Sequence, residues 1–378
     1  MGPNLVIDKS LIETISVQEL EELSAWFDIV CVPPLFHEII ADLRHPSPRR
    51  VPDDLVSLLA YKMNRGFATL DSIDALDVAY TEFISNQRVP MEGSVPVAGP
   101  HVKVSADGEY VLYDSTVQQR MWTRLASKQF DENDFRIAEE WRQGTGKVDL
   151  TALRTNWKPF VKDVLGNPPA NINAIVEAID AYVSTPDVSI QQRLFGLVCD
   201  MLVVEDAKRI AGSLELARQR GTTRLMRDLR PYCLSMLRLV LIYLAAIARG
   251  AWGERQTDEI DLQYLFYAPF CFAFSSFDKF HRAFWAAATP ATGSGGFMWG
   301  PDLRTDLQAR RNRRAEMTAE DWKQHRRTYG HHPWPSPNSP IQRVYNALGE
   351  PRPFDPDVRP QIDSAKLNEM IEHLRKLE

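Results

Sequence analysis

The sequence lacks a cysteine pairing motif. Its four cysteines lie far apart, and no two of them form a CxxC pair. Cys31, Cys199 and Cys271 stand among apolar residues, which is typical of small buried side chains. A disulfide framework and a cysteine zinc site are therefore not expected, and this cysteine usage suits a reducing cytoplasm.

Long hydrophobic runs are also scarce. The first residues, 1–12, include an Asp and a Lys and no long apolar stretch, so no signal peptide is predicted. Residues 232–248 are apolar except for Ser235 and Arg238. Because this run is shorter than the ~20 residues of a membrane span and has a charge near its middle, it predicts a buried core helix.

Several catalytic patterns are missing as well. Gly144-Thr145-Gly146-Lys147 is similar to a phosphate-binding loop, but Trp141 stands where that loop needs its first glycine, and Val148 follows the lysine. The pair His331 and His332 has no cysteine or acid at ligand spacing. No Ser-His-Asp or Cys-His arrangement has a recognisable local context. Neither an ATP site nor a histidine metal site is predicted.

The overall composition is that of a folded protein. The chain has 378 residues, of which 44% are hydrophobic and 25% charged, which predicts two or three lobes. Its net charge of −6 argues against a protein that coats nucleic acid with its whole surface. A local basic groove stays compatible with this charge, because phosphate contacts need only a patch.

Short apolar runs and helical periodicity predict an α/β fold built from both ends of the chain. Residues 5–7, 28–32 and 271–275 predict buried strands, each followed by a helix. Lys103 to Tyr113 alternates around Asp107-Gly108, which predicts a hairpin. The predicted parts are a sheet domain made from residues 1–45 and 255–300, a mainly helical insertion over 46–254, and a C-terminal extension over 301–378. The extension is expected to hold a charged helix at about 302–328, a proline-rich link at 333–340 and an amphipathic helix at 363–377.

Five acidic residues occupy related positions in this pattern. Asp8 and Asp278 follow predicted strands, and Glu38 lies one turn into the helix after the second strand. Asp258 and Asp261 are three residues apart in the first turn of a helix, hence on one face. In an open parallel sheet, strand carboxyl ends and helix starts border one crevice, so these acids are expected to meet there.

Clustered carboxylates suggest a divalent metal. They repel one another, and the pKa of each rises unless a cation neutralises the group. Mg²⁺ and Mn²⁺ prefer oxygen ligands, and such ions activate water and stabilise an in-line attack at phosphorus. The acids therefore predict metal-dependent phosphodiester hydrolysis.

Two blocks of the sequence resemble the PIN-like (large PIN-domain-like) metal-dependent nuclease family. The first block is Leu5-Val6-Ile7-Asp8-Lys9-Ser10 with Ile29-Val30-Cys31-Val32-Pro33-Pro34-Leu35-Phe36-His37-Glu38-Ile39. The second block is Asp258-Glu259-Ile260-Asp261-Leu262-Gln263-Tyr264-Leu265 with Phe274-Ser275-Ser276-Phe277-Asp278-Lys279-Phe280. The resemblance implies a parallel sheet between helices, and Mg²⁺- or Mn²⁺-dependent cleavage of RNA, sometimes of structured DNA.

The resemblance also implies roles for single residues. The implied catalytic metal ligands are Asp8, Glu38, Asp261 and Asp278, with Asp258 as a fifth acid; the implied donors beside the ligands are Ser10 and Ser276. The third ligand is either Asp258 or Asp261, and the resemblance does not decide between the two. The insertion is much longer than in compact family members.

Each acid also has a simpler interpretation. Asp8 and Asp278 suit helix N-caps, and the two acids at 258 and 261 suit the positive end of a helix dipole. Glu38 suits a solvated helix face, as lone glutamates usually do. The coincidence of all five at related positions favours the metal site.

Basic residues gather in two stretches. Residues 208–238 hold eight Lys or Arg against two acids, and residues 304–327 hold eight against four. In an acidic chain, this asymmetry indicates a footprint for a polyanion, although charged helix faces explain it equally well. The predicted nucleic-acid contacts are Arg224, Arg227, Arg310, Arg311, Arg313 and Arg314.

Taken together, these patterns predict a cytoplasmic, metal-dependent nuclease of the PIN-like kind, with RNA favoured over DNA. The alternative is a non-catalytic scaffold of the same fold that binds protein partners or nucleic acid. A wholly helical regulatory protein is a third, weaker hypothesis. No membrane association is expected, and an oligomer or a protein partner stays open.

Overall fold

The structure, a computed structural model, describes most of the chain. The described residues are 2–45, 51–65, 69–85, 87–91, 95–96, 102–104, 111–113, 117–144, 150–166, 171–204, 226–253, 255, 257–289, 296–329, 332–336 and 338–349.

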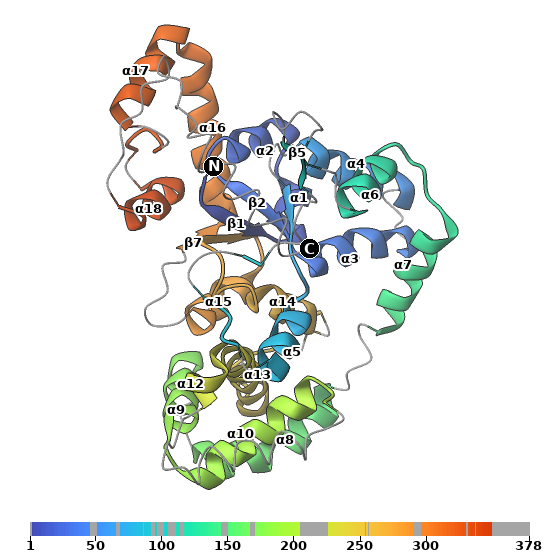
Figure 1. Ribbon diagram of the computed structural model, residues 1–378, viewed down its shortest axis with the longest axis vertical. Helices are drawn as coiled ribbons and strands as arrows, with labels where there is room; N and C mark the ends of the chain where they lie inside the picture. Colours follow the sequence, from blue (N-terminus) through green and yellow to red (C-terminus); the bar gives the residue numbers. More distant parts are fainter. Residues whose placement is uncertain are drawn as a thin grey trace.

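A five-stranded sheet in the order β3-β2-β1-β6-β7 lies at the centre of the molecule (Figure 1). Its strands are β1 (Asn4–Ile7), β2 (Asp28–Cys31), β3 (Thr69–Asp71), β6 (Ala273–Ser276) and β7 (Gly296–Trp299). Every neighbouring pair is parallel. The expected α/β class, a parallel sheet flanked by helices, is therefore confirmed, and the wholly helical hypothesis is wrong.

The two ends of the chain meet inside this sheet. Strand β1 pairs with β6 in the register Leu5↔Ala273, Val6↔Phe274 and Ile7↔Ser275. The β1 and β6 positions are fully buried, as expected for parallel strands with both faces covered. Residues remote in sequence are thereby brought to the same edge of the sheet.

Five helices surround the strand ends. They are α1 (Lys9–Thr14), α2 (Val17–Ser24), α3 (Pro33–Ala41, extended by the 3₁₀ turn Asp42–Arg44), α14 (Asp258–Leu265) and α15 (Lys279–Ala288). Local chemistry explains their starts. Ser16 and Glu19 form a capping box at α2, and Pro33 opens α3 at a position where its missing N–H costs nothing.

The segment between the two sheet-forming ends is mainly helical. It contains α4 (Pro52–Arg65), α5 (Ala75–Ser85), α6 (Val117–Ala126), α7 (Glu132–Gly144), α8 (Leu150–Leu165), α9 (Ile172–Ser184), α10 (Val188–Met201), α12 (Met226–Leu229) and α13 (Pro231–Arg249). An antiparallel pair, β4 (Val102–Val104) and β5 (Val111–Tyr113), falls where the sequence predicts a hairpin. Strand β3, which the sequence did not predict, also comes from this segment and extends the sheet beyond β2.

Helix α13 is the apolar run recognised in the sequence. By length and composition it is able to cross a membrane, but 78% of its most apolar window is buried inside the protein. Arg238, near the middle of the helix, pairs with Asp180 of α9, with Nη2 2.9 Å from Oδ2. This burial fits the predicted core helix.

The C-terminal part folds into α16 (Gly300–Glu316), α17 (Ala319–Tyr329) and α18 (Pro340–Ala347). One helix was predicted over 302–328, but the chain breaks after Glu316 because Thr318 and Asp321 cap a new helix. Helix α18 begins at Pro340, the last residue of the predicted proline-rich link. The amphipathic helix predicted at 363–377 lies outside the described residues.

Candidate functional site

Asp8 and Asp278 lie at strand ends and cap the helices that follow. Asp8 comes directly after β1, and its Oδ1 accepts a hydrogen bond from Leu11 N at 2.9 Å. Asp278 follows β6, and its Oδ1 accepts from Phe280 N at 2.7 Å. The simpler interpretation of these two acids as N-caps is therefore correct, but it uses Oδ1 of each carboxylate for the cap and leaves Oδ2 for other contacts.

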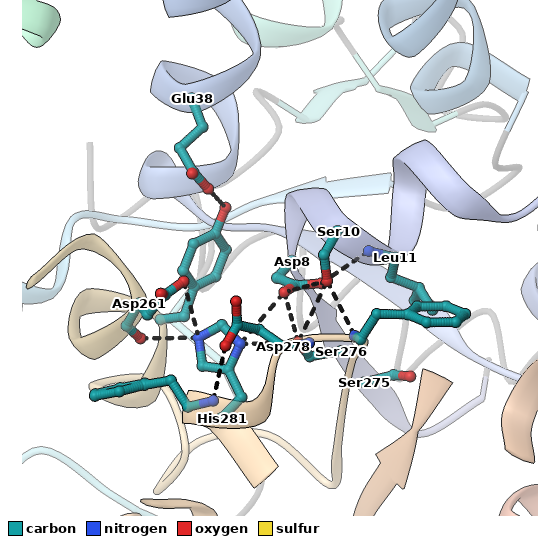
Figure 2. Close-up of polar contacts among 12 residues, drawn as sticks. Asp8, Ser10, Leu11, Glu38, Asp261, Ser275, Ser276, Asp278 and His281 are labelled. Carbon is teal, nitrogen blue, oxygen red and sulfur yellow. Dashed lines mark hydrogen bonds and ion pairs between the residues drawn. The ribbon is translucent and has the colours of Figure 1, made fainter. Parts of the chain in front are cut away.

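Ser276 joins the two acids at one point (Figure 2). Its buried hydroxyl donates to Asp8 Oδ2 at 2.6 Å and accepts from Asp278 N at 2.7 Å. Ser10 donates to both oxygens of Asp8, at 2.9 and 2.7 Å, and accepts from Phe277 N. The two serines thus act as donors beside Asp8, and Asp8 and Asp278 occupy a single site.

His281, which the sequence reasoning missed, lies between two acids. Its Nδ1 is 2.9 Å from Ser276 Oγ and 3.3 Å from Asp8 Oδ2; its Nε2 is 2.9 Å from the backbone oxygen of Asp261. Complete burial alone would lower the pKa of His281, but Asp8 and Asp261 raise it to about 9. These neighbours therefore favour the charged form of the imidazole, which compensates the Asp8 carboxylate and lowers the pKa of Asp261.

Arg255, also missed, contacts the other side of the acid group. Its guanidinium nitrogens lie 3.3 Å from Asp278 Oδ2, 3.9 Å from Asp261 Oδ2 and 3.7 Å from Asp258 Oδ1. The Arg255 side chain is 60% exposed, whereas these three carboxylates are 1–18% exposed. Arg255 therefore covers the acids from the solvent side.

Glu38 projects from α3 toward α14. Its Oε2 accepts a hydrogen bond from the hydroxyl of Tyr264, and the Tyr264 ring lies edge-on to His281. Burial raises the pKa of Glu38 to about 7, although the bond from Tyr264 and the charge of Lys9 lower it. Burial, with the charges of Asp278, Glu38 and Asp8 added, raises the pKa of Asp261 to about 8 against the opposing charge of His281. These shifts indicate a buried site with an excess of negative charge.

The donor set is compatible with a divalent cation, but its present arrangement is not that of a metal site. Within the described residues, no three or more His, Cys, Asp or Glu side chains are placed so that they could hold a metal ion together. However, Asp258 Oδ1 and Asp261 Oδ2 are buried and accept no hydrogen bond from any of the described residues. Buried oxygens of this kind are costly unless a cation or a donor approaches them. The other oxygen of Asp258 accepts from Trp252 Nε1 at 2.9 Å.

The predicted nucleic-acid contacts do not lie at the acids. Arg310 is only 3% exposed and forms a buried ion pair with Asp306 at 3.0 Å. The prediction that it contacts nucleic acid is therefore wrong. Arg314 pairs with Glu22 of α2 at 3.0 Å, and Arg313 lies over the ring of Trp334.

The remaining predicted contacts lie on different helices or outside the described residues. Arg311 is half-buried on α16, Arg227 is exposed on α12, and Arg224 lies outside the described residues.

Comparison with protein-family models, with curated proteins and with solved structures finds no match. The function of the site is therefore argued from its geometry. His281 had a detectable signal, since it stands three residues after Asp278 in the first turn of a helix. Arg255 had only its position three residues before Asp258, which is not specific.

Proposed function

We propose that the chain is a metal-dependent nuclease with a PIN-like fold that hydrolyses phosphodiester bonds, with RNA as the expected substrate. The observation that carries this proposal is that Ser276 Oγ bonds both the Asp8 carboxylate and the backbone N–H of Asp278, at the carboxyl edge of a parallel sheet. Asp261 lies within the influence of the charges of Asp8, Glu38 and Asp278, and Arg255 lies within 4 Å of Asp258, Asp261 and Asp278. The preference for RNA follows the sequence resemblance.

Asp8, Asp278 and Asp261 would hold Mg²⁺ or Mn²⁺, with Asp258 and Glu38 as the adjoining acids. When bound, such an ion supplies an activated water and compensates charge on the phosphate. The chain's own contribution is positional. Ser10 and Ser276 fix the Asp8 carboxylate by hydrogen bonds, and His281 offsets part of its charge.

The decisive test removes the negative charge of the capping acids but keeps their capping hydrogen bonds. Asn caps a helix about as well as Asp, so Asp278→Asn should keep the fold. Asp8→Asn leaves the buried His281 without its counter-charge, so circular dichroism must first show that this variant folds. Each variant should lose about 100-fold or more in Mn²⁺-dependent cleavage of single-stranded RNA, since several kcal/mol of transition-state stabilisation depend on the metal. Initial cleavage rates would be measured with wild-type protein and with Asp302→Asn, an exposed acid in α16, as the matched control. Wild-type rates in both site variants would sink the proposal.

A second candidate function is a non-catalytic scaffold of the same fold. It is favoured by the saturation of Asp8, whose two oxygens accept bonds from Ser10, Ser276 and Leu11 N without any metal. Binding of nucleic acid that neither Mg²⁺ nor Mn²⁺ stimulates, together with absent cleavage, would select this candidate.

A further inference from the structure

Arg255 occupies the position from which a metal ion would compensate the acids. Its three contacts join Asp258 and Asp261 of α14 to Asp278 before α15. The two acid oxygens without a hydrogen-bond partner, Asp258 Oδ1 and Asp261 Oδ2, are the atoms that Arg255 faces at 3.7 and 3.9 Å. These separations are too long for hydrogen bonds, so the guanidinium supplies charge but does not satisfy the oxygens.

We propose that Arg255 is an exchangeable cation: it holds the acids in the metal-free protein and binds a phosphate of the substrate once the metal has entered. This inference rests on the proposed nuclease function. A single positive charge at these distances compensates three buried carboxylates incompletely, whereas a divalent ion compensates them better and also ligates the unpartnered oxygens.

The side chain of Arg255 is suited to such an exchange. It is 60% exposed, and its one further hydrogen bond is to the neighbouring Thr257, with Nη2 3.0 Å from Oγ1. A metal ion bound to the acids would repel the guanidinium. It would also neutralise the carboxylates that attract Arg255 in the metal-free protein. The same group then faces solvent next to the metal, where a phosphodiester approaches, and guanidinium is a strong bidentate partner of phosphate.

The exchange has two consequences, of which the second distinguishes it from a fixed structural ion pair. Arg255 competes with the metal, so removing its charge should tighten metal binding in the absence of nucleic acid. Phosphate draws Arg255 away from the acids, so metal and nucleic acid should strengthen each other's binding, and this coupling is reciprocal. A fixed ion pair also weakens metal binding through its charge, but it does not link metal binding to nucleic-acid binding.

The experiment is a Mn²⁺ titration of the full chain followed by electron paramagnetic resonance. Compared with wild type, Arg255→Gln should bind Mn²⁺ about tenfold more tightly, and Arg255→Lys, which keeps the charge, should resemble wild type. A phosphorothioate-linked RNA pentamer, which resists hydrolysis, should tighten Mn²⁺ binding to wild type about tenfold and Mn²⁺ binding to Arg255→Gln much less, since only the metal's own attraction for phosphate is left in that variant. Thermal unfolding by circular dichroism checks that both variants fold.

The possible results separate this inference from the proposed function. Equal Mn²⁺ affinities in wild type, Arg255→Gln and Arg255→Lys would overturn the exchange while leaving a metal site in place. No Mn²⁺ binding by any of the three proteins would overturn both the nuclease and the exchange. Tighter binding by Arg255→Gln together with an undiminished effect of the pentamer would overturn the phosphate-binding half.

Discussion

The Asp8 carboxylate is held by side chains that are remote from it in the sequence. Ser276, the last residue of β6, and His281 of α15 contact Asp8 Oδ2 at 2.6 and 3.3 Å. Since Asp8 and His281 are both buried, each compensates the charge of the other, and the loss of one partner leaves an uncompensated charge.

His281→Gln keeps a polar side chain but removes this charge. It should lower the free energy of unfolding by about 3–5 kcal/mol, as expected when one member of a buried ion pair is lost. In a double-mutant cycle with Asp8→Asn, the two changes should couple by about 2 kcal/mol, measured by urea denaturation with EDTA present. Lys279→Gln, an exposed charge on the same helix, serves as the control and should be additive with Asp8→Asn. Additivity of His281→Gln as well would show that the contact has no energetic weight.

Within the site, the sequence predicted only those residues whose place follows from an adjacent strand or helix in the chain. Asp8 and Asp278 follow strands, so their meeting follows from the parallel sheet alone. His281 and Arg255 matter because of their partners in space, and neither the apolar pattern nor the capping pattern reports such partners. The burial of Arg310 was missed for a related reason, since its partner Asp306 and the hydroxyl of Ser339 enclose a charge that looks exposed in sequence.

Among the elements, those with a strong pattern were predicted and those without one were not. Strands β1, β2 and β6 are apolar runs, and helices such as α9 and α13 show clear periodicity. Strand β3 is only three residues long and ends in an Asp, and β7 begins at the last glycine of a Gly-rich stretch. Their pairing in the sheet stabilises them, not their local preference.

Helices α16 and α17 are attached to α2 through a cluster of aromatic side chains. His325 of α17 is buried against the rings of Trp26, Trp322 and Trp334. Burial lowers the pKa of His325 to about 4, with the charges of Arg326, Arg313 and Arg310 acting in the same direction against a hydrogen bond to His332 O. The cluster therefore excludes a proton that the unfolded chain accepts at its ordinary pKa of about 6.5.

This exclusion predicts an acid-sensitive C-terminal attachment. The folded pKa is lower than the unfolded one, so the stability is intact above about pH 6.5 and falls as the pH drops toward 4. The wild type should lose about 2–3 kcal/mol more than His325→Gln between pH 7 and pH 4.5. Urea unfolding followed by tryptophan fluorescence measures this difference, and parallel pH profiles for the two proteins would contradict it.

At the scale of the whole molecule, the sheet makes one unit from segments that are remote in sequence. Strands β1 and β6 pair along their length, and the β6 residue Phe274 packs against Trp285 of α15 and Phe297 of β7. The chain leaves the sheet after β2 and β3, runs through the helical segment and returns to the sheet region at α14 (Figure 1). The acid site exists only while β1 and β6 stay paired, because Asp8 follows β1 and Asp278 follows β6.

Native-state hydrogen exchange tests whether the two ends open together. Phe274→Ala removes a fully buried ring from the central pair and should cost about 3–5 kcal/mol. If the sheet is one cooperative unit, the amides of β1 and β6 should lose the same protection free energy, although only β6 carries the change. Leu58→Ala on α4, where the side chain is 47% exposed, should leave both strands unchanged. Loss of protection confined to β6 would mean that the N-terminal strand holds its place without its partner, and Asp8 would then be positioned independently of Asp278.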